Sequence, residues 1–311
     1  MMKFLNNSNS STPRRGNIVE VRPFHEIEQT LDENGQLDRM PFMPEMVQYC
    51  GQRFRVTRRV HYVCVDGNGM RGMNDTVTLE NNYCDGSVHD GCQKACTLFW
   101  KTAWLKYPSG DETDATQQDK LSTTDVLKTR DEVTNKYICQ STCLASATCL
   151  LTRRLKPVFL AKELFSGNQR FDKFLTNFGH YLRYKLANGS TNSVCHMLKG
   201  KSDQAPRESL KLKAGDWVEV KTPDEIAGTL DTTGKNHGLV FTSEMHHFCG
   251  KRYQVRQRLD KMVSETSGQM VKLRDTVLLE NVTCFGICKF GCSRQLFHYW
   301  REIWLKKIDS V

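Results

Sequence analysis

Cysteines are the residues of this chain whose type and spacing point most directly to chemistry. The sequence has 311 residues and 13 cysteines. Eight of them form two similar sets, which are Cys50, Cys84, Cys92 and Cys96 in the first third of the chain and Cys249, Cys284, Cys288 and Cys292 near its end. Thiolates are preferred ligands of structural zinc, which takes four ligands, and of iron–sulfur clusters. Each set therefore predicts one metal site, with zinc as the first expectation and an iron–sulfur cluster as the alternative.

Other uses of these thiols stay open at the level of sequence. The first 15 residues are polar and lack the apolar run of a secretory signal, so we expect a cytoplasmic protein, in which stable disulfides are uncommon. Buried free cysteines can also serve as small apolar side chains. Cys139 is a weaker candidate for a catalytic thiol, in the spacing Cys139-x₃-Cys143-x₅-Cys149. A helix that packs these cysteines along an apolar face is the simpler interpretation.

The segments that must position the two cysteine sets form an internal sequence repeat. Residues 16–60 match residues 215–259 with 18 identities in 45 positions, and residues 70–106 match residues 270–306 with 15 identities in 37. The cysteines that coincide are Cys50 with Cys249, Cys84 with Cys284, and Cys92 with Cys292. The fourth cysteine of each set, Cys96 or Cys288, has no counterpart in the other copy. The duplication predicts two modules with one fold.

Within each module short apolar runs alternate with turn signals such as Asp66-Gly67-Asn68-Gly69. Strands at spacings of about ten residues are typical of small all-β barrels and sandwiches. We therefore predict a mainly β protein with two tandem SH3-like modules. Residues 26–31 fit one helical turn. The tryptophans recur at i and i+4, a spacing that fits either a short helix or a closing strand, and they are Trp100, Trp104, Trp300 and Trp304.

Composition divides the rest of the chain. The predicted parts are a disordered N-terminus at 1–15, a first β-module at 16–107, a polar linker at 108–136, a basic helical connector at 137–213 and a second β-module at 214–308. Residues 151–213 carry thirteen lysines and arginines against four acids, a balance equal to the +9 net charge of the whole chain. An amphipathic helix is expected near 168–186, with Arg170, Lys173, Arg183 and Lys185 available to phosphate groups of nucleic acid or to another anionic partner. A buried helix with a solvated basic face is the simpler interpretation.

Several function classes lack support in this sequence. It has no G-x-x-x-x-G-K-[ST] loop, no G-x-S-x-G elbow and no H-E-x-x-H motif, and no run of about 20 apolar residues that would predict a transmembrane segment. His89, His246 and His247 have no histidine at the matching position of the other module, so we do not expect them to be ligands. Glu45 does recur, as Glu244, and we expect it to form an ion pair with Arg53.

Some motifs resemble a family of uncharacterised bacterial proteins with a duplicated, cysteine-containing SH3-like module. The motifs that carry this resemblance are Pro41-Phe42-Met43-Pro44-Glu45-Met46, Tyr49-Cys50-Gly51-Gln52-Arg53, Cys84-Asp85-Gly86-Ser87, Cys139-Gln140-Ser141-Thr142 and Ser166-Gly167-Asn168. Members of that family often lie near genes of natural-product biosynthesis, which implies an accessory or tailoring role. Cys143 departs from the family pattern, which weakens a metal site built on Cys139, Cys143 and Cys149.

We therefore predict a metal-stabilised binding, scaffold or accessory protein of a biosynthetic pathway, with a protein or peptide partner. The first alternative is a tailoring enzyme that uses a reactive cysteine or an open metal site. The second is a nucleic-acid-binding protein that uses the basic segment 151–213. In the scaffold interpretation the four tryptophans either line a binding groove or fill the cores of the modules.

Overall fold

The computed structural model describes residues 12–108, 126–151, 162, 166–168, 179, 198–201, 203–286 and 292–309. The predicted basic helix with Arg170, Lys173, Arg183 and Lys185 lies outside the described residues, and so do Cys195 and Cys288. The chain forms two compact units, of which the first comprises Met1–His89, Thr97–Phe174 and Glu265–Gln269 and the second comprises Asp90–Cys96, Leu175–Ser264 and Met270–Val311. No helix in the described part of the chain has the length and apolar character needed to cross a membrane.

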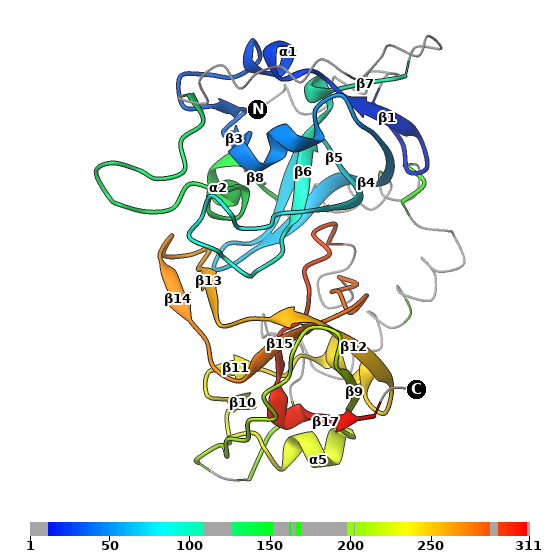
Figure 1. Cartoon of the computed structure of the whole chain (residues 1–311), viewed down its shortest axis with the longest axis vertical. Helices are drawn as coiled ribbons and strands as arrows, with labels where there is room; N and C mark the ends of the chain where they lie inside the picture. The colour runs from blue at the N-terminus through cyan, green and yellow to red at the C-terminus, as the bar shows by residue number, and fades with distance from the viewer. Residues whose placement is uncertain are drawn as a thin grey trace. The chain divides into compact units, whose positions relative to one another are not determined.

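One antiparallel sheet organises the first unit, in the strand order β6-β5-β4-β1-β7 (Figure 1). Its strands are β1 (Ile18–Val21), β4 (Arg53–Val65), β5 (Gly69–Tyr83), β6 (Thr97–Lys101) and β7 (Leu105–Lys106), with β8 (Cys149–Leu150) paired to β5. The short elements around it are α1 (Phe24–Glu28), β2 (Gln36–Leu37), β3 (Met40–Pro41), η1 (Pro44–Tyr49), η2 (Thr102–Trp104) and α2 (Gln140–Ala147). The predicted turn at residues 66–69 joins the two long strands β4 and β5.

The main sheet of the second unit has the equivalent order β16-β15-β12-β9-β17. Its strands are β9 (Trp217–Val220), β12 (Arg252–Arg258), β15 (Thr276–Leu279), β16 (Trp300–Arg301) and β17 (Leu305–Ile308). The other elements are α5 (Pro223–Ala227), β10 (Lys235–Asn236), β11 (Leu239–Val240), η5 (Ser243–Phe248), β13 (Lys261–Val263), β14 (Met270–Lys272) and η7 (Glu302–Trp304). The prediction of a mainly β protein is confirmed, and within the described residues both main sheets are open at their end strands.

The repeated tryptophans form the centre of each core. Trp100 and Trp104 are fully buried and pack edge-on against Phe42, with ring centroids 6.1 and 5.2 Å away. The indole N–H of Trp104 donates to Thr30 Oγ1 at 3.1 Å, which satisfies its one polar group. The second unit has the same arrangement, in which Trp300 and Trp304 are also fully buried against Phe241 and Trp304 donates to Thr229 Oγ1. These side chains fill cores and do not line a groove.

A repeated ion pair lies across β1 and β4, but its acid is not the predicted one. Arg53 stands directly opposite Glu20 in the strand register, and Arg53 Nε lies 3.3 Å from Glu20 Oε2. Arg252 pairs with Glu219 in the same way at 3.5 Å. The predicted pairing of Glu45 with Arg53 is therefore wrong, because the cross-strand position puts Glu20 within reach of the arginine.

Helix α2 closes the outer edge of β6 in the first unit. Its first residue, Gln140, accepts a hydrogen bond from Phe99 N and donates one to Phe99 O, both at 2.8 Å. One amide side chain thus replaces a neighbouring strand. Cys139 precedes the helix, is 8% exposed and packs in the apolar core, and burial raises the pKa of Cys143. These positions agree with apolar packing of the cysteines and give no support to a reactive Cys139.

Each unit also includes a short segment from the other predicted module. In the second unit, Gln93 Oε1 accepts hydrogen bonds from Asp260 N at 2.7 Å and Lys261 N at 3.0 Å. In the first unit, Glu265 accepts from Asp66 N at 2.9 Å and from Ser141 Oγ at 3.1 Å. The compact units consequently do not follow the repeat boundaries along the sequence.

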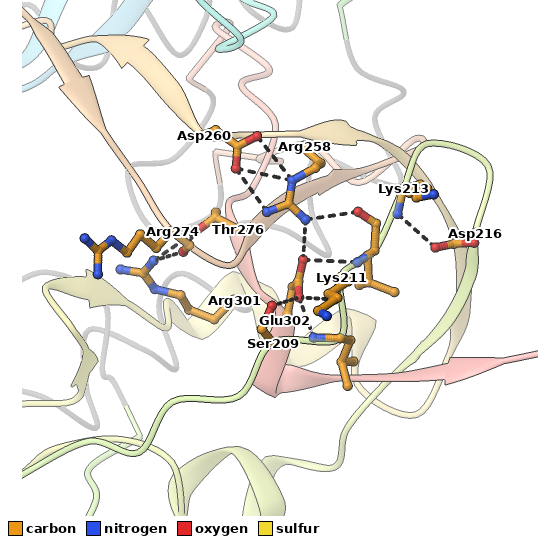
Figure 2. A network of polar contacts seen from close by, with 12 residues as sticks. Ser209, Lys211, Lys213, Asp216, Arg258, Asp260, Arg274, Thr276, Arg301 and Glu302 are labelled. Carbon is orange, nitrogen blue, oxygen red and sulfur yellow. Dashed lines mark hydrogen bonds and ion pairs between the residues drawn. The ribbon is translucent and has the colours of Figure 1, made fainter.

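A buried carboxylate anchors the segment that leads into β9. Glu302 is fully buried and accepts hydrogen bonds from Leu210 N at 2.6 Å and Lys211 N at 2.9 Å. Arg258 Nη1 lies 2.7 Å from the other oxygen of Glu302, and Arg258 Nη2 donates to Asp260 Oδ1 at 3.0 Å (Figure 2). The charge is compensated by an arginine and by several N–H donors, which is the condition for burying a carboxylate without a large loss of stability.

Replacing Glu302 should release this segment. Glu302→Gln keeps the side-chain shape but leaves Arg258 without its buried partner, and we expect a loss of about 3 kcal/mol of local stability. Hydrogen exchange of the full chain should show faster exchange at the amides of Leu210, Lys211 and Leu212. Glu208→Gln is the matched control, because its exposed pair with Lys221 should contribute less than about 1 kcal/mol. Unchanged protection in the Glu302 variant would contradict the anchoring role.

His61 is a second buried polar group, on strand β4. Its Nε2 atom has no hydrogen-bond partner among the described residues. Burial lowers the pKa of His61 to about 3, with further lowering by the charges of Arg59, Lys162 and Arg58. The folded chain therefore keeps this imidazole neutral, whereas the unfolded chain protonates it near its ordinary pKa of about 6.5.

The first unit should consequently lose stability in acid. Between pH 6.5 and 3 the unfolded chain binds a proton that folded His61 does not, so stability falls as the pH decreases through this window. We expect His61 to account for a loss of about 3 kcal/mol between about pH 7.5 and 4.5. His61→Gln should flatten the pH dependence of the urea midpoint. The control His25→Gln, at an exposed position, should leave this pH dependence unchanged. Equal slopes for the two variants would rule His61 out as the source.

Candidate functional site

Three side chains of the first unit converge on one point. Glu45 comes from η1, Cys84 follows the end of β5, and His89 lies in the turn five residues later. One ligand atom of each residue lies within 4.8 Å of the others, and in the described part of the chain no other group of three or more histidines, cysteines or acids meets this condition. Cys84 Sγ is 3.3 Å and His89 Nδ1 is 3.5 Å from Glu45 Oε1.

The ring orientation of His89 is fixed from outside the group. Its Nε2 lies 2.9 Å from the carbonyl oxygen of Ile138. A carbonyl can only accept, so Nε2 carries a proton and Nδ1 faces Glu45 and Cys84. Such a bond on the far ring nitrogen is the usual support of a metal-bound histidine.

Two atoms of this group lack hydrogen-bond partners within the described residues. They are Glu45 Oε2 and His89 Nδ1, and the two side chains are only 1% and 2% exposed. A buried polar atom without a partner costs about 1–3 kcal/mol. A cation held between the carboxylate and the imidazole would remove this cost for both atoms.

A proton is the alternative to a metal ion at this position. Burial lowers the pKa of His89, but the contact with Glu45 and the hydrogen bond to Ile138 O raise it more, so the net pKa lies above its ordinary value. Without a metal, His89 can therefore be a charged imidazolium beside the Glu45 carboxylate. The group therefore accommodates a positive charge, either as a metal ion or as a proton on His89.

Of the four predicted ligands in the first module, only Cys84 belongs to this group. Cys50 follows η1 and packs against the core of the first unit. Cys92 and Cys96 belong to the second unit, where Cys92 Sγ accepts a hydrogen bond from Val263 N at 3.3 Å. Burial raises the pKa of Cys92, which disfavours the thiolate form.

The sequence contains signals for the two members of this group that lie outside the predicted ligand set. The signal for Glu45 is its recurrence in the second module as Glu244. Among the described residues the one basic side chain paired with Glu45 is His89. His89 follows Cys84 at a spacing of five, within the range of local ligand pairs. The repeat obscures this second signal, because the matching position of the second module is Lys289.

The predicted ligands of the second module are differently placed. Burial raises the pKa of Cys249 to about 11, and its thiol donates to Met245 O at 3.8 Å. Burial raises the pKa of Cys284 well above its ordinary value, and Glu244 raises it further. Cys292 is buried beside Gly286. The eleven cysteines that the structure describes form no disulfides.

A pocket of about 500 Å³ lies in the second unit. Its wall has more bases than acids, with Arg207, Lys272, Arg274 and Arg301 against Glu208 and Asp275. Arg301 is tied to the backbone, since it donates to His237 O at 2.9 Å and to Asn236 O at 3.3 Å. Arg274 is exposed, and no side-chain partner engages its guanidinium among the described residues. The pocket therefore offers a free positive charge at its rim.

This pocket corresponds to the place that α2 occupies in the first unit. Tyr299 and Leu239 line it, and their counterparts by the repeat are Phe99 and Met40. Phe99 is the residue that Gln140 binds, and Met40 belongs to β3, against which α2 packs. Helix α2 thus occupies in the first unit the position that is a pocket in the second unit.

Comparison of the chain with protein-family models, curated proteins and solved structures finds no match. Function is therefore inferred from the geometry of these two places.

The group in the first unit should bind one divalent metal ion through sulfur, oxygen and nitrogen. Co²⁺ is a useful probe because a cobalt–thiolate bond absorbs in the near ultraviolet. Adding Co²⁺ to the full chain should produce this absorption, and Cys84→Ser should lower it by the contribution of this thiolate. Cys64→Ser is the matched control, because Cys64 lies on β4 and outside the group. An absorption of the same strength in Cys84→Ser and in the unmodified chain would exclude Cys84 as a ligand.

Proposed function

We propose that this chain is a zinc-stabilised binding protein, in which the pocket of the second unit receives a segment of a partner protein. The observation that carries the binding role is the correspondence between this pocket and the seat of α2. A surface that accepts a helix in one copy of a module is a natural binding surface in the other copy. The metal has a structural role in this proposal.

Zinc is the metal that fits the donors best. A thiolate, an imidazole and a carboxylate are its common ligands, at about 2.0–2.3 Å from the ion. Ligand atoms around a tetrahedral zinc are then about 3.4 Å apart. The distances of 3.3 Å from Cys84 to Glu45 and 3.5 Å from Glu45 to His89 agree with this spacing. Zinc binding would displace the thiol proton and link metal affinity to the stability of the module.

Both modules are SH3-like in this proposal. Five strands in equivalent order support this assignment, and so do the 3₁₀ helices η2 and η7, which lead into the last strands β7 and β17. The family resemblance implies a biosynthetic setting. In that setting the partner is a biosynthetic enzyme, or a carrier or peptide that such an enzyme modifies.

The partner segment should be acidic and should contain a residue with a side-chain amide, as Gln140 has. In the first unit the α2 residue that binds the edge strand is Gln140, which bonds to both backbone groups of Phe99. The pocket of the second unit adds the exposed charges of Arg274 and Lys272 to this geometry. Complementary negative charge on the partner would favour association and orient the segment.

An enzymatic role is the second candidate, and one observation favours it. The group in the first unit supplies three ligands, as catalytic zinc sites do, and so leaves a fourth position for water or substrate. Burial of the Glu45 and His89 side chains favours the structural role over this alternative, since it restricts access to the ion.

A peptide copied from α2 tests the binding role. The probe has the sequence of residues 137–150 with serine in place of its three cysteines, and it carries Ala145→Glu and Ser146→Glu at the positions that are exposed in α2. We expect the labelled peptide to bind the full chain in fluorescence polarisation. Arg274→Glu in the protein should weaken binding at least about tenfold, because it places like charges together.

Two controls separate specific docking from general charge attraction. Lys251→Glu reverses an exposed charge away from the pocket and should leave the affinity nearly unchanged. A probe with Gln140→Ala should bind much more weakly, because it lacks the amide that bonds to the strand edge. Absence of binding to the unmodified protein, or equal binding of both probes, would contradict the proposal.

A further inference from the structure

In the second unit a histidine and a cysteine both interact with one buried glutamate. Glu244 Oε2 lies 3.8 Å from His298 Nε2, and their side chains are 3% and 10% exposed. Cys284 shares a hydrogen bond with the same glutamate. His298 Nε2 is buried and has no hydrogen-bond partner among the described residues. The unpaired imidazole nitrogen therefore faces a buried carboxylate, as in the first unit.

A fourth donor stands next to this group. Gly286 lies beside both Cys284 and Cys292. A side chain at Gly286 would meet Cys292 N at 2.6 Å, so only glycine permits the chain to turn this tightly beside Cys292. Gly286 N also donates to Cys284 Sγ at 3.3 Å, a contact that stabilises sulfur in its charged form.

The two modules obtain their histidine from different positions. Glu45 and Cys84 correspond to Glu244 and Cys284 in the repeat. His89, however, corresponds to Lys289, and His298 corresponds to Leu98. A histidine thus lies beside the equivalent buried carboxylate in both modules, from two different positions of the sequence. A purely apolar role for the histidine would not require this coincidence, whereas a shared need for an imidazole beside the buried carboxylate explains it.

We infer that Glu244, Cys284 and His298, with Cys292 as fourth donor, form a second divalent-metal site of the zinc class. The ligand atoms are spread more widely here than in the first unit, where they lie within 4.8 Å of one another. Binding therefore requires a side-chain rotation that brings the thiol and the imidazole to the ion. The Cys284 thiol loses its proton in this step and becomes a zinc-bound thiolate.

Zinc stoichiometry of the full chain tests this inference. After dialysis against Zn²⁺, elemental analysis should find one zinc fewer per chain in His298→Leu than in the unmodified protein. Leucine is chosen because the first module has Leu98 at this position. His89→Leu should also lose one zinc, and the double variant should lose two. Cys284→Ser, a smaller change, should repeat the loss seen in His298→Leu and guards against misfolding of that variant.

The pattern of losses separates the two sites. A full zinc content in both His298→Leu and Cys284→Ser would overturn the second site and leave the site of the first unit intact. A loss in these variants together with full content in His89→Leu would support the second site and remove the first. Circular dichroism of each variant should match the unmodified protein, so that a missing ion reports a missing ligand.

Discussion

A carboxylate enclosed within each module sets the condition that the surrounding residues must meet. The side chains of Glu45 and Glu244 are 1% and 3% exposed, and a histidine nitrogen lies 3.5 Å from the first and 3.8 Å from the second. A buried carboxylate is costly unless charge and hydrogen-bond donors surround it. The chain that follows β5 or β15 supplies the thiol in each module, and a histidine completes the environment. The path of this chain is therefore governed by the needs of the glutamate as much as by packing.

Several irregular segments of this protein are held by one polar side chain that serves two or more backbone groups. Gln140 does so for Phe99, Gln93 for residues 260 and 261, and Glu302 for residues 210–212. Each device satisfies backbone groups that no strand or helix covers. The sheets of the modules are small, and such anchors extend the ordered structure beyond them. They also explain why segments outside the sequence repeat become part of compact units.

Duplication has allowed one architecture to acquire two different surfaces. Both modules retain the buried tryptophans, the threonine that accepts from the indole, and the cross-strand pair of glutamate and arginine. The edge strand differs, since α2 covers it in the first unit and a basic pocket lies at the equivalent place in the second. The core is constrained by packing in both copies, whereas the edge was free to change. This division fits a protein whose stability and binding reside in different parts.

Features that depend on local pattern can be read directly from the amino-acid sequence. Alternating apolar residues and glycine turns predict the strands, and the recurrence of Trp100, Trp104 and Cys84 in register predicts two modules with similar cores. Cys84 is also marked as a possible ligand. Glu45 is not, because its partners lie on another segment, and the signal of His89 is obscured because the matching residue of the second module is Lys289.

Arg53 forms its ion pair with Glu20, because the strand register places the two residues directly opposite each other. Glu45 is therefore not paired with Arg53 and belongs to the candidate site. Folding brings η1, the end of β5 and the following turn to one point. The meeting of three segments depends on loop paths and burial, and no local periodicity encodes these.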